Sequence, residues 1–118
     1  MIKFFAAFLF LLFFTMCTYK KEELLFTNTC DTTNVKYSVQ VLNTLSINCT
    51  GCHAGQSAAG GIELDGYNKV RMQALNGRLL GSITHAPGYR PMPDFSSKIP
   101  ECRIAEIRTW IRNGTPNN

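Results

Sequence analysis

The sequence lacks several features that would place it in a large class of proteins. Its 118 residues contain no internal repeat and no low-complexity segment. They also contain no cluster of lysine and arginine, which argues against a nucleic-acid partner. The longest apolar run, residues 4–14, is shorter than the roughly 20 residues that span a bilayer as a helix, so a permanent transmembrane helix is disfavoured. The length and composition therefore predict one small domain that follows an apolar N-terminal segment.

The N-terminus has the pattern of a secretory signal peptide. Lys3 precedes the apolar run, and the charged segment Lys20-Lys21-Glu22-Glu23 follows shortly after it. We therefore expect residues 1–16 to be a signal peptide. The mature protein is expected to be exported, on the periplasmic or cell-surface side of a bacterial membrane.

Cys17 follows the apolar run at the position where bacterial lipoproteins carry their lipid-modified cysteine. Phe14 and Met16 depart from the lipoprotein pattern, in which a small residue usually precedes the cysteine. We predict lipidation of Cys17 and thus a membrane anchor, with plain secretion or an uncleaved anchor as the alternatives. Residues 17–29 show no sustained helical period and are expected to form a tether without a fold of its own.

Residues 30–118 carry helical patterns and form the expected folded domain. Apolar residues at three- and four-residue spacing predict helices near residues 38–48 and 67–75, and a further short turn or helix begins near Arg78. The helix near 67–75 is expected to turn Val70, Met72 and Ala74 inward. A last helix is expected to begin with Pro100 and to be capped by Gly114. The domain is therefore predicted to be all-α, with three to four short helices.

Cys49-Thr50-Gly51-Cys52-His53 is a C-x-x-C-H motif, the attachment signature of c-type haem. The spacing holds the two thiols about one helical turn apart, which suits their addition to the two vinyl groups of one porphyrin. The adjacent histidine is thereby delivered to the iron as proximal ligand. We predict one covalently attached haem c. Because a domain this small buries little surface, we expect the haem to complete the core and the apoprotein to be largely unfolded.

The same motif has two competing interpretations. A thioredoxin-like redox dithiol usually lies in a βαβ unit, but no strand pattern flanks this one. A zinc site is the second alternative, since Cys30 and Cys102 can join Cys49 and Cys52 in a tetrahedron, or His53 can replace one of them. Zinc sites usually contain a second close pair of cysteines, however, and this sequence has none. The expected export also favours haem, which is attached to apocytochromes c outside the cytoplasm.

Each of the five cysteines in the chain can be given a role. Cys17 is assigned to the lipid anchor, and the two cysteines of the motif are assigned to the haem thioethers. Cys30 and Cys102 are left over. In an oxidising compartment we expect these two to form a disulfide, with two buried free thiols as the alternative.

The opposite face of the iron needs a second ligand, and the sequence offers Met92, Met72 and His85. Pro91 and Pro93 frame Met92 in an extended, rigid loop, which pre-positions a weakly binding thioether. Met72 lies on a predicted helix and is expected to fill the core. His85 lies in the same loop region, and we expect it at the surface or beside the ligand. Met92 is the predicted distal ligand, with His85 as its rival.

Four segments combine into a recognisable pattern: Asn48–His53, Gly77–Ile83, Gly88–Pro93 and Ile104–Gly114. In this combination they resemble the small monohaem class I cytochromes c, and more narrowly the exported cytochrome c-like domains of Bacteroidota-type bacteria. The resemblance implies an all-α fold in which the N- and C-terminal helices cross, with Tyr37 or Val41 meeting Trp110. It also implies His53 as proximal and Met92 as distal ligand.

The predicted ligands imply electron transfer. With His53 and Met92 at both axial positions, no site is open for oxygen or peroxide, so we expect outer-sphere one-electron transfer and no enzymatic activity. Arg78 and Arg90 are candidates to pair with the haem propionates, and Trp110 is a candidate to donate to them from its indole. The expected partners are a quinol-oxidising complex, an oxidase or a periplasmic oxidoreductase.

Two alternative functions follow from the weaker points of this interpretation. A labile Met92 would make the protein a haem-based gas-binding or peroxidase-like protein. A chain without haem would be a structural lipoprotein held together by zinc or a disulfide.

Overall fold

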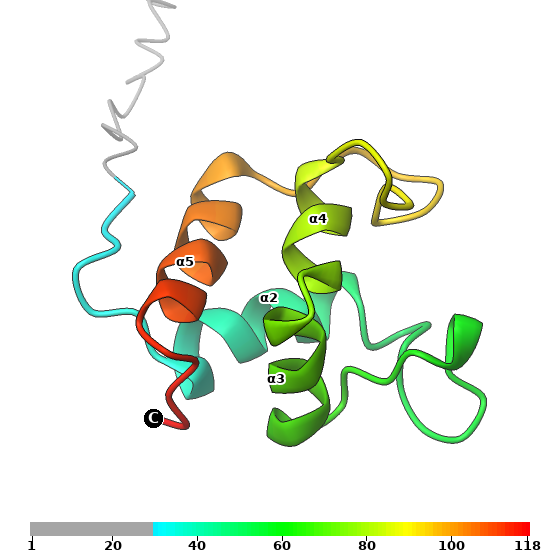
Figure 1. Ribbon diagram of the computed structural model, residues 1–118, viewed down its shortest axis with the longest axis horizontal. Coiled ribbons are helices and arrows are strands. Elements are labelled where there is room, and N and C mark those ends of the chain that lie inside the picture. The colour runs from blue at the N-terminus through cyan, green and yellow to red at the C-terminus, as the bar shows by residue number, and fades with distance from the viewer. Residues whose placement is uncertain (1–29) are drawn as a thin grey trace, which may run out of the picture.

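The folded part of the chain consists of helices joined by loops, and no strand occurs between residues 30 and 118 (Figure 1). The computed structural model describes residues 30–118; the predicted signal peptide (1–16), the tether (17–29) and the lipidation site Cys17 lie outside the described residues. In this range no helix has both the length and the hydrophobicity that crossing a membrane requires. The all-α prediction is confirmed.

The helices lie where the apolar periods predict them. In chain order the elements are the π-helical turn η2 (Tyr37–Val41), α2 (Leu42–Asn48), the 3₁₀ turn η3 (Ala59–Gly61), α3 (Tyr67–Leu75), α4 (Arg78–Thr84) and α5 (Glu101–Arg112). Because η2 continues directly into α2, the segment predicted near 38–48 is helical throughout. The range predicted for α3 matches the observed one.

The C-terminal helix α5 packs against η2, and aromatic rings meet at the contact. Trp110 is completely buried, and its ring centroid lies 5.6 Å from that of Tyr37. The predicted meeting of Tyr37 with Trp110 is confirmed. Tyr67 of α3 lies edge-on to Tyr37, with the ring centroids 5.1 Å apart, and its hydroxyl donates to the carbonyl of Thr115. Such edge-on pairs contribute about 0.5–1.5 kcal/mol beyond the burial of their surface.

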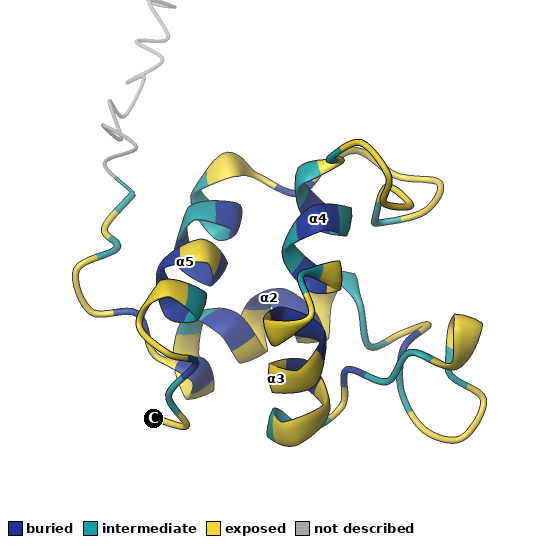
Figure 2. Ribbon diagram, viewed as in Figure 1, coloured by how far each residue is buried: buried dark blue, intermediate teal, exposed yellow. Residues whose placement is uncertain are grey.

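The helices enclose one hydrophobic core, and their buried positions face one another (Figure 2). The core residues come from η2, from every α-helix and from the segments before η2, α3 and α5: Val35, Tyr37, Val41, Leu45, Leu64, Val70, Ala74, Leu79, Ile83, Ile99, Ile104, Ile107 and Trp110. Helix α4 packs against both α3 and α5. The N-terminal and C-terminal parts of the domain therefore share one hydrophobic core.

Two details of the predicted helices are wrong. Met72 is 57% exposed, whereas its neighbour Gln73 is only 6% exposed. Adjacent helical residues differ by about 100° in direction, so an error of one residue in the inward face exchanges the two. Pro100 precedes α5 with extended ψ of 140° and is its N-cap rather than its first helical residue. Gly114 follows the helix with φ of 85°, the left-handed conformation that commonly ends a helix.

A disulfide joins Cys30, at the start of the described residues, to Cys102 in the first turn of α5. The S–S distance is 2.12 Å, the Cα atoms are 5.3 Å apart, and 72 positions separate the two residues in the sequence. This is the pairing predicted for the two cysteines that remain after Cys17, Cys49 and Cys52 have been assigned. The bridge fixes the chain that enters the domain to the helix that ends it.

Candidate functional site

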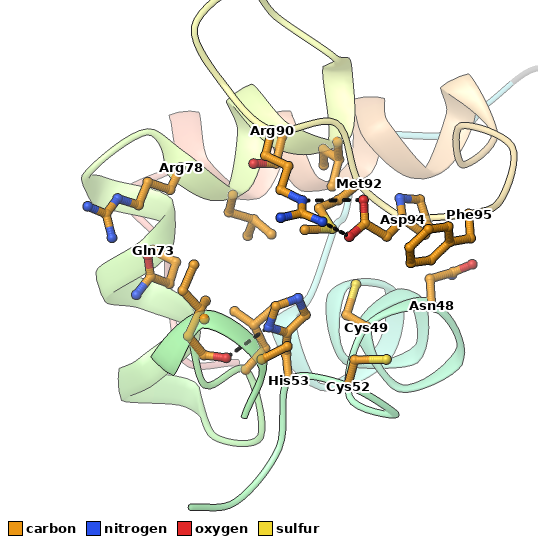
Figure 3. A pocket seen from close by; sticks show the side chains of 18 residues that line it. Asn48, Cys49, Cys52, His53, Gln73, Arg78, Arg90, Met92, Asp94 and Phe95 are labelled. Carbon is orange, nitrogen blue, oxygen red and sulfur yellow. Dashed lines mark hydrogen bonds and ion pairs between the residues drawn. The ribbon is translucent and has the colours of Figure 1, made fainter. Parts of the chain in front are cut away.

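A cavity of about 450 Å³ opens between α2, α3, α4 and the loop that follows α4 (Figure 3). Its size falls within the range of about 300–1,000 Å³ that is usual for small-molecule and cofactor sites. The wall is largely apolar, with Ile62, Leu64, Leu79, Ile83 and Pro93 among the lining residues. The structure brings together on this wall the four residues predicted to hold a haem: Cys49, Cys52, His53 and Met92.

The C-x-x-C-H motif forms a turn at the end of α2. The N–H groups of Cys49 and Thr50 both donate to the carbonyl of Leu45, at 2.8 and 3.0 Å, where α2 ends. The N–H groups of Cys52 and His53 then both donate to the carbonyl of Cys49, at 3.1 and 3.0 Å. This turn carries both thiols and the imidazole to the same cavity. The chain contacts this turn again at η3, where the N–H of Ala59 donates to the carbonyl of Cys52 at 2.8 Å.

His53 is oriented by a backbone carbonyl from the loop before α3. Its Nδ1 lies 3.0 Å from the carbonyl oxygen of Ile62, and only 9% of the residue is exposed. Because a carbonyl oxygen only accepts, Nδ1 carries the proton, and Nε2 keeps a lone pair that can bind a metal ion. The N–H of Leu64 donates back to the carbonyl of His53 at 2.7 Å, so the histidine is fixed by its main chain as well.

Met92 lies across the cavity from His53 (Figure 3). Its N–H donates to the carbonyl of Ser82 in α4 at 3.1 Å. Its own carbonyl accepts from Nε2 of His85 at 3.0 Å. His85 is exposed and does not line the cavity, and Met72 is exposed on α3. Of the three candidates for the distal ligand, Met92 is the one that reaches the site, while His85 supports the backbone of Met92.

The three residues expected near the haem propionates lie in different surroundings. Arg78 and Arg90 line the cavity (Figure 3). Arg90 forms an ion pair with Asp94, with Nη2 2.5 Å from Oδ2, whereas Arg78 forms no ion pair within residues 30–118. The role predicted for Trp110 is wrong, because its indole N–H donates to the carbonyl of Pro116 at 2.8 Å and its ring belongs to the helix contact.

The cavity also includes polar side chains that sequence reasoning missed. Gln73 is buried on α3, and its Oε1 accepts from the side chain of Asn76 at 3.2 Å. Its side-chain N–H₂ group adds a donor at the wall. The spacing of three residues from Val70 is the signal that places Gln73 on the inner face. Asn48 and Phe95 line the cavity as well; Asn48 begins one of the segments that carry the resemblance, but the sequence assigned neither residue a role.

The two competing interpretations of the motif fit this geometry poorly. Burial raises the pKa of the Cys49 thiol to about 11, whereas redox dithiols depend on a lowered thiol pKa. For zinc, Cys30 and Cys102 are joined to each other in a disulfide. Between residues 30 and 118, no group of three ligand-bearing side chains within 4.8 Å of one another includes Cys49, Cys52 or His53.

The donor set and the shape of the cavity suit a haem. Two thiols on one turn, a buried histidine with a free Nε2 and a methionine across an apolar cavity are the groups that a covalently attached, six-coordinate haem requires. No protein-family model matches the chain, and neither the curated proteins nor the solved structures yield a match.

Proposed function

We propose that this protein is an exported monohaem c-type cytochrome that carries single electrons and has no enzymatic activity. The observation that supports this most strongly is the single cavity wall shared by Cys49, Cys52, His53 and Met92. These residues come from two segments separated by about 40 positions, so their meeting is a property of the fold and not of the motif alone. We also infer that the helical arrangement is a small class I cytochrome c fold.

Each of the four residues has a separate task in this proposal. The thiols of Cys49 and Cys52 form the thioethers that fix the porphyrin in the cavity. Nε2 of His53 would bind the iron, and the hydrogen bond from Nδ1 to Ile62 fixes the tautomer and the orientation of the ring. The thioether sulfur of Met92 would supply the second protein ligand.

The surroundings favour electron transfer over bond-breaking chemistry. Haem iron supplies a one-electron couple between Fe(III) and Fe(II), whose potential is raised by histidine and methionine ligation relative to two histidines. Met92 is held by Ser82 and His85, which would keep its thioether at the distal position of a bound haem and so would disfavour the binding of small molecules there. The apolar wall of Leu64, Leu79 and Ile83 would keep water away from a haem iron in this cavity and so would limit reorganisation on electron transfer.

The partners and the location follow from the same proposal. A His/Met cytochrome suits acceptance of electrons from a quinol-oxidising complex or a periplasmic oxidoreductase and donation to an oxidase. Lipidation of Cys17 would hold the domain at a bacterial membrane on its outer side, with residues 17–29 as the tether. Arg78 and Arg90 remain the candidates to pair with the propionates.

A haem stain on a denaturing gel tests the proposal directly, because thioether-bound haem survives denaturation. The full chain is produced in a bacterium with an active c-type haem maturation system, and a known c-type cytochrome serves as the positive control. We expect a stained band at the mass of the protein. The stain should be lost in the variant that combines Cys49→Ala with Cys52→Ala. It should persist in the matched variant Cys30→Ser with Cys102→Ser, which removes the disulfide instead. An unstained wild-type band beside a stained positive control would refute the proposal.

A further inference from the structure

The aromatic ring of Tyr89 lies directly against the backbone of α4. A Cβ atom added at Gly81 would lie 2.5 to 2.6 Å from three carbons of the ring, which no real side-chain contact tolerates. A Cβ atom added at Gly77, one turn earlier, would lie 3.2 Å from the Tyr89 hydroxyl oxygen. The ring therefore extends along the helix from Gly81 towards Gly77, and it occupies space that the missing side chain of Gly81 leaves open.

The loop that carries Tyr89 is attached to α4 at both of its ends. The N–H of Ala86 donates to the carbonyl of Gly81 at 2.9 Å, and the N–H of Met92 donates to the carbonyl of Ser82 at 3.1 Å. The side chain of His85 adds a contact at the same end of the loop, because its Nε2 donates to the carbonyl of Met92 at 3.0 Å. These contacts lie at the ends of the loop, whereas the ring of Tyr89 holds its middle against α4.

We propose that Tyr89 is a positioning residue for the distal ligand, and that its contact with Gly81 sets how closely Met92 approaches the cavity. This inference rests on the proposed function, in which Met92 binds the iron. A thioether binds weakly, so the fraction of molecules in which Met92 is correctly placed determines how completely the distal site stays closed. The hydroxyl of Tyr89 makes no hydrogen bond within residues 30–118, so the ring itself makes the contact.

A double-mutant cycle on the haem-loaded protein tests this role. Gly81→Ala inserts a methyl group into the space of the ring, and Tyr89→Ala removes the ring. Tyr89→Phe keeps the ring without its hydroxyl. Gly66→Ala is the matched control, because a methyl group there meets no atom within 4 Å and the backbone is extended. Haem staining and far-ultraviolet circular dichroism check that every variant is loaded and folded.

The readouts are the weak long-wavelength band of a ferric haem with a thioether ligand and the rate of carbon monoxide binding to the ferrous form. We expect Gly81→Ala to diminish the band and to speed carbon monoxide binding by about tenfold or more, because the open form becomes more populated. Tyr89→Ala should act in the same direction. Adding Gly81→Ala to Tyr89→Ala should have no further effect, because the ring that clashes is gone. Tyr89→Phe and Gly66→Ala should match the wild type.

Two results would overturn the inference while leaving the proposed function intact. One is an unchanged band and unchanged carbon monoxide binding in Gly81→Ala. The other is an equal effect of Gly81→Ala with and without Tyr89, which would assign the effect to the helix itself. A wild-type protein that is loaded with haem but lacks the band contradicts Met92 as ligand, and with it this inference.

Discussion

Removal of the Cys30–Cys102 disulfide is expected to lower the stability of the domain by a large fraction. The bridge joins residues that are 72 positions apart, so it restricts most of the described chain in the unfolded state. In the chain-entropy description a closed loop of this length contributes about 4 kcal/mol. Small domains have a total free energy of unfolding of about 5–15 kcal/mol. One kcal/mol shifts the melting temperature of a domain this size by about 4–8 °C, so we expect a fall of about 15–30 °C.

Thermal unfolding of the haem-loaded protein measures this effect. The variant Cys30→Ser with Cys102→Ser is compared with the wild type, and each is melted with and without a thiol reductant. With the haem held in the ferrous state in every sample, the thiol reductant should lower the melting temperature of the wild type to that of the variant and leave the variant unchanged, since it reduces the disulfide but not the thioethers. Both cysteines are only partly buried, so the serine hydroxyls can reach water. A fall of less than about 5 °C would refute the reasoning, because it corresponds to about 1 kcal/mol or less.

Three further changes have distinct expected results. Trp110→Phe removes the hydrogen bond to the carbonyl of Pro116 and part of a completely buried ring. It should lower the free energy of unfolding by about 2 kcal/mol or more in denaturant titrations and leave the haem spectrum and potential unchanged. A shifted potential at unchanged stability would instead restore a role at the propionates. Met92→Ala should open the distal position and allow rapid carbon monoxide binding, whereas His85→Ala should keep the thioether band. If the low-spin spectrum persists in Met92→Ala and is lost in the double variant, His85 is the ligand instead. In the folded chain burial raises the pKa of Cys49 to about 11, so the thiol would resist alkylation until the pH approaches that value. Because we expect the apoprotein to be largely unfolded, Cys49 should instead titrate near its ordinary pKa of about 8.5 and be alkylated readily at about pH 9. Protection of Cys49 at that pH would show that the chain folds without haem.

The helices were predictable because the signals that form them are local. The apolar spacing in α3 gave its range, and Pro100 and Gly114 marked the two ends of the last helix to within a residue. The rotation of α3 about its axis was less predictable. Gln73 faces the interior and Met72 faces solvent, because the packing of α3 against α4 decides which side is buried. Hydrophobicity alone favours Met72 for the interior, and the tertiary contact overrides it.

Trp110 shows why the site could be predicted only in part. Its place at the contact between α5 and η2 followed from the expected helix crossing. The direction of its indole N–H did not, because the acceptor is the carbonyl of Pro116 in the segment after the helix. A backbone carbonyl leaves no trace in the side-chain sequence, so a hydrogen bond to it cannot be inferred from a pattern of residues.

Backbone carbonyls also support both predicted iron ligands, so a residue pattern could not reveal these contacts either. The contacts matter because they would affect the redox potential of a bound haem. His53 is oriented by the carbonyl of Ile62, and Met92 is held through the carbonyl of Ser82 and the side chain of His85. The motif and the proline-framed methionine predict the ligands, but they do not predict these supports. Since such supports tune ligand basicity and redox potential, two chains with the same C-x-x-C-H motif and the same methionine can differ in potential. In the proposed cytochrome, the potential would therefore depend on the segments around residues 62 and 82 as well as on the ligands themselves.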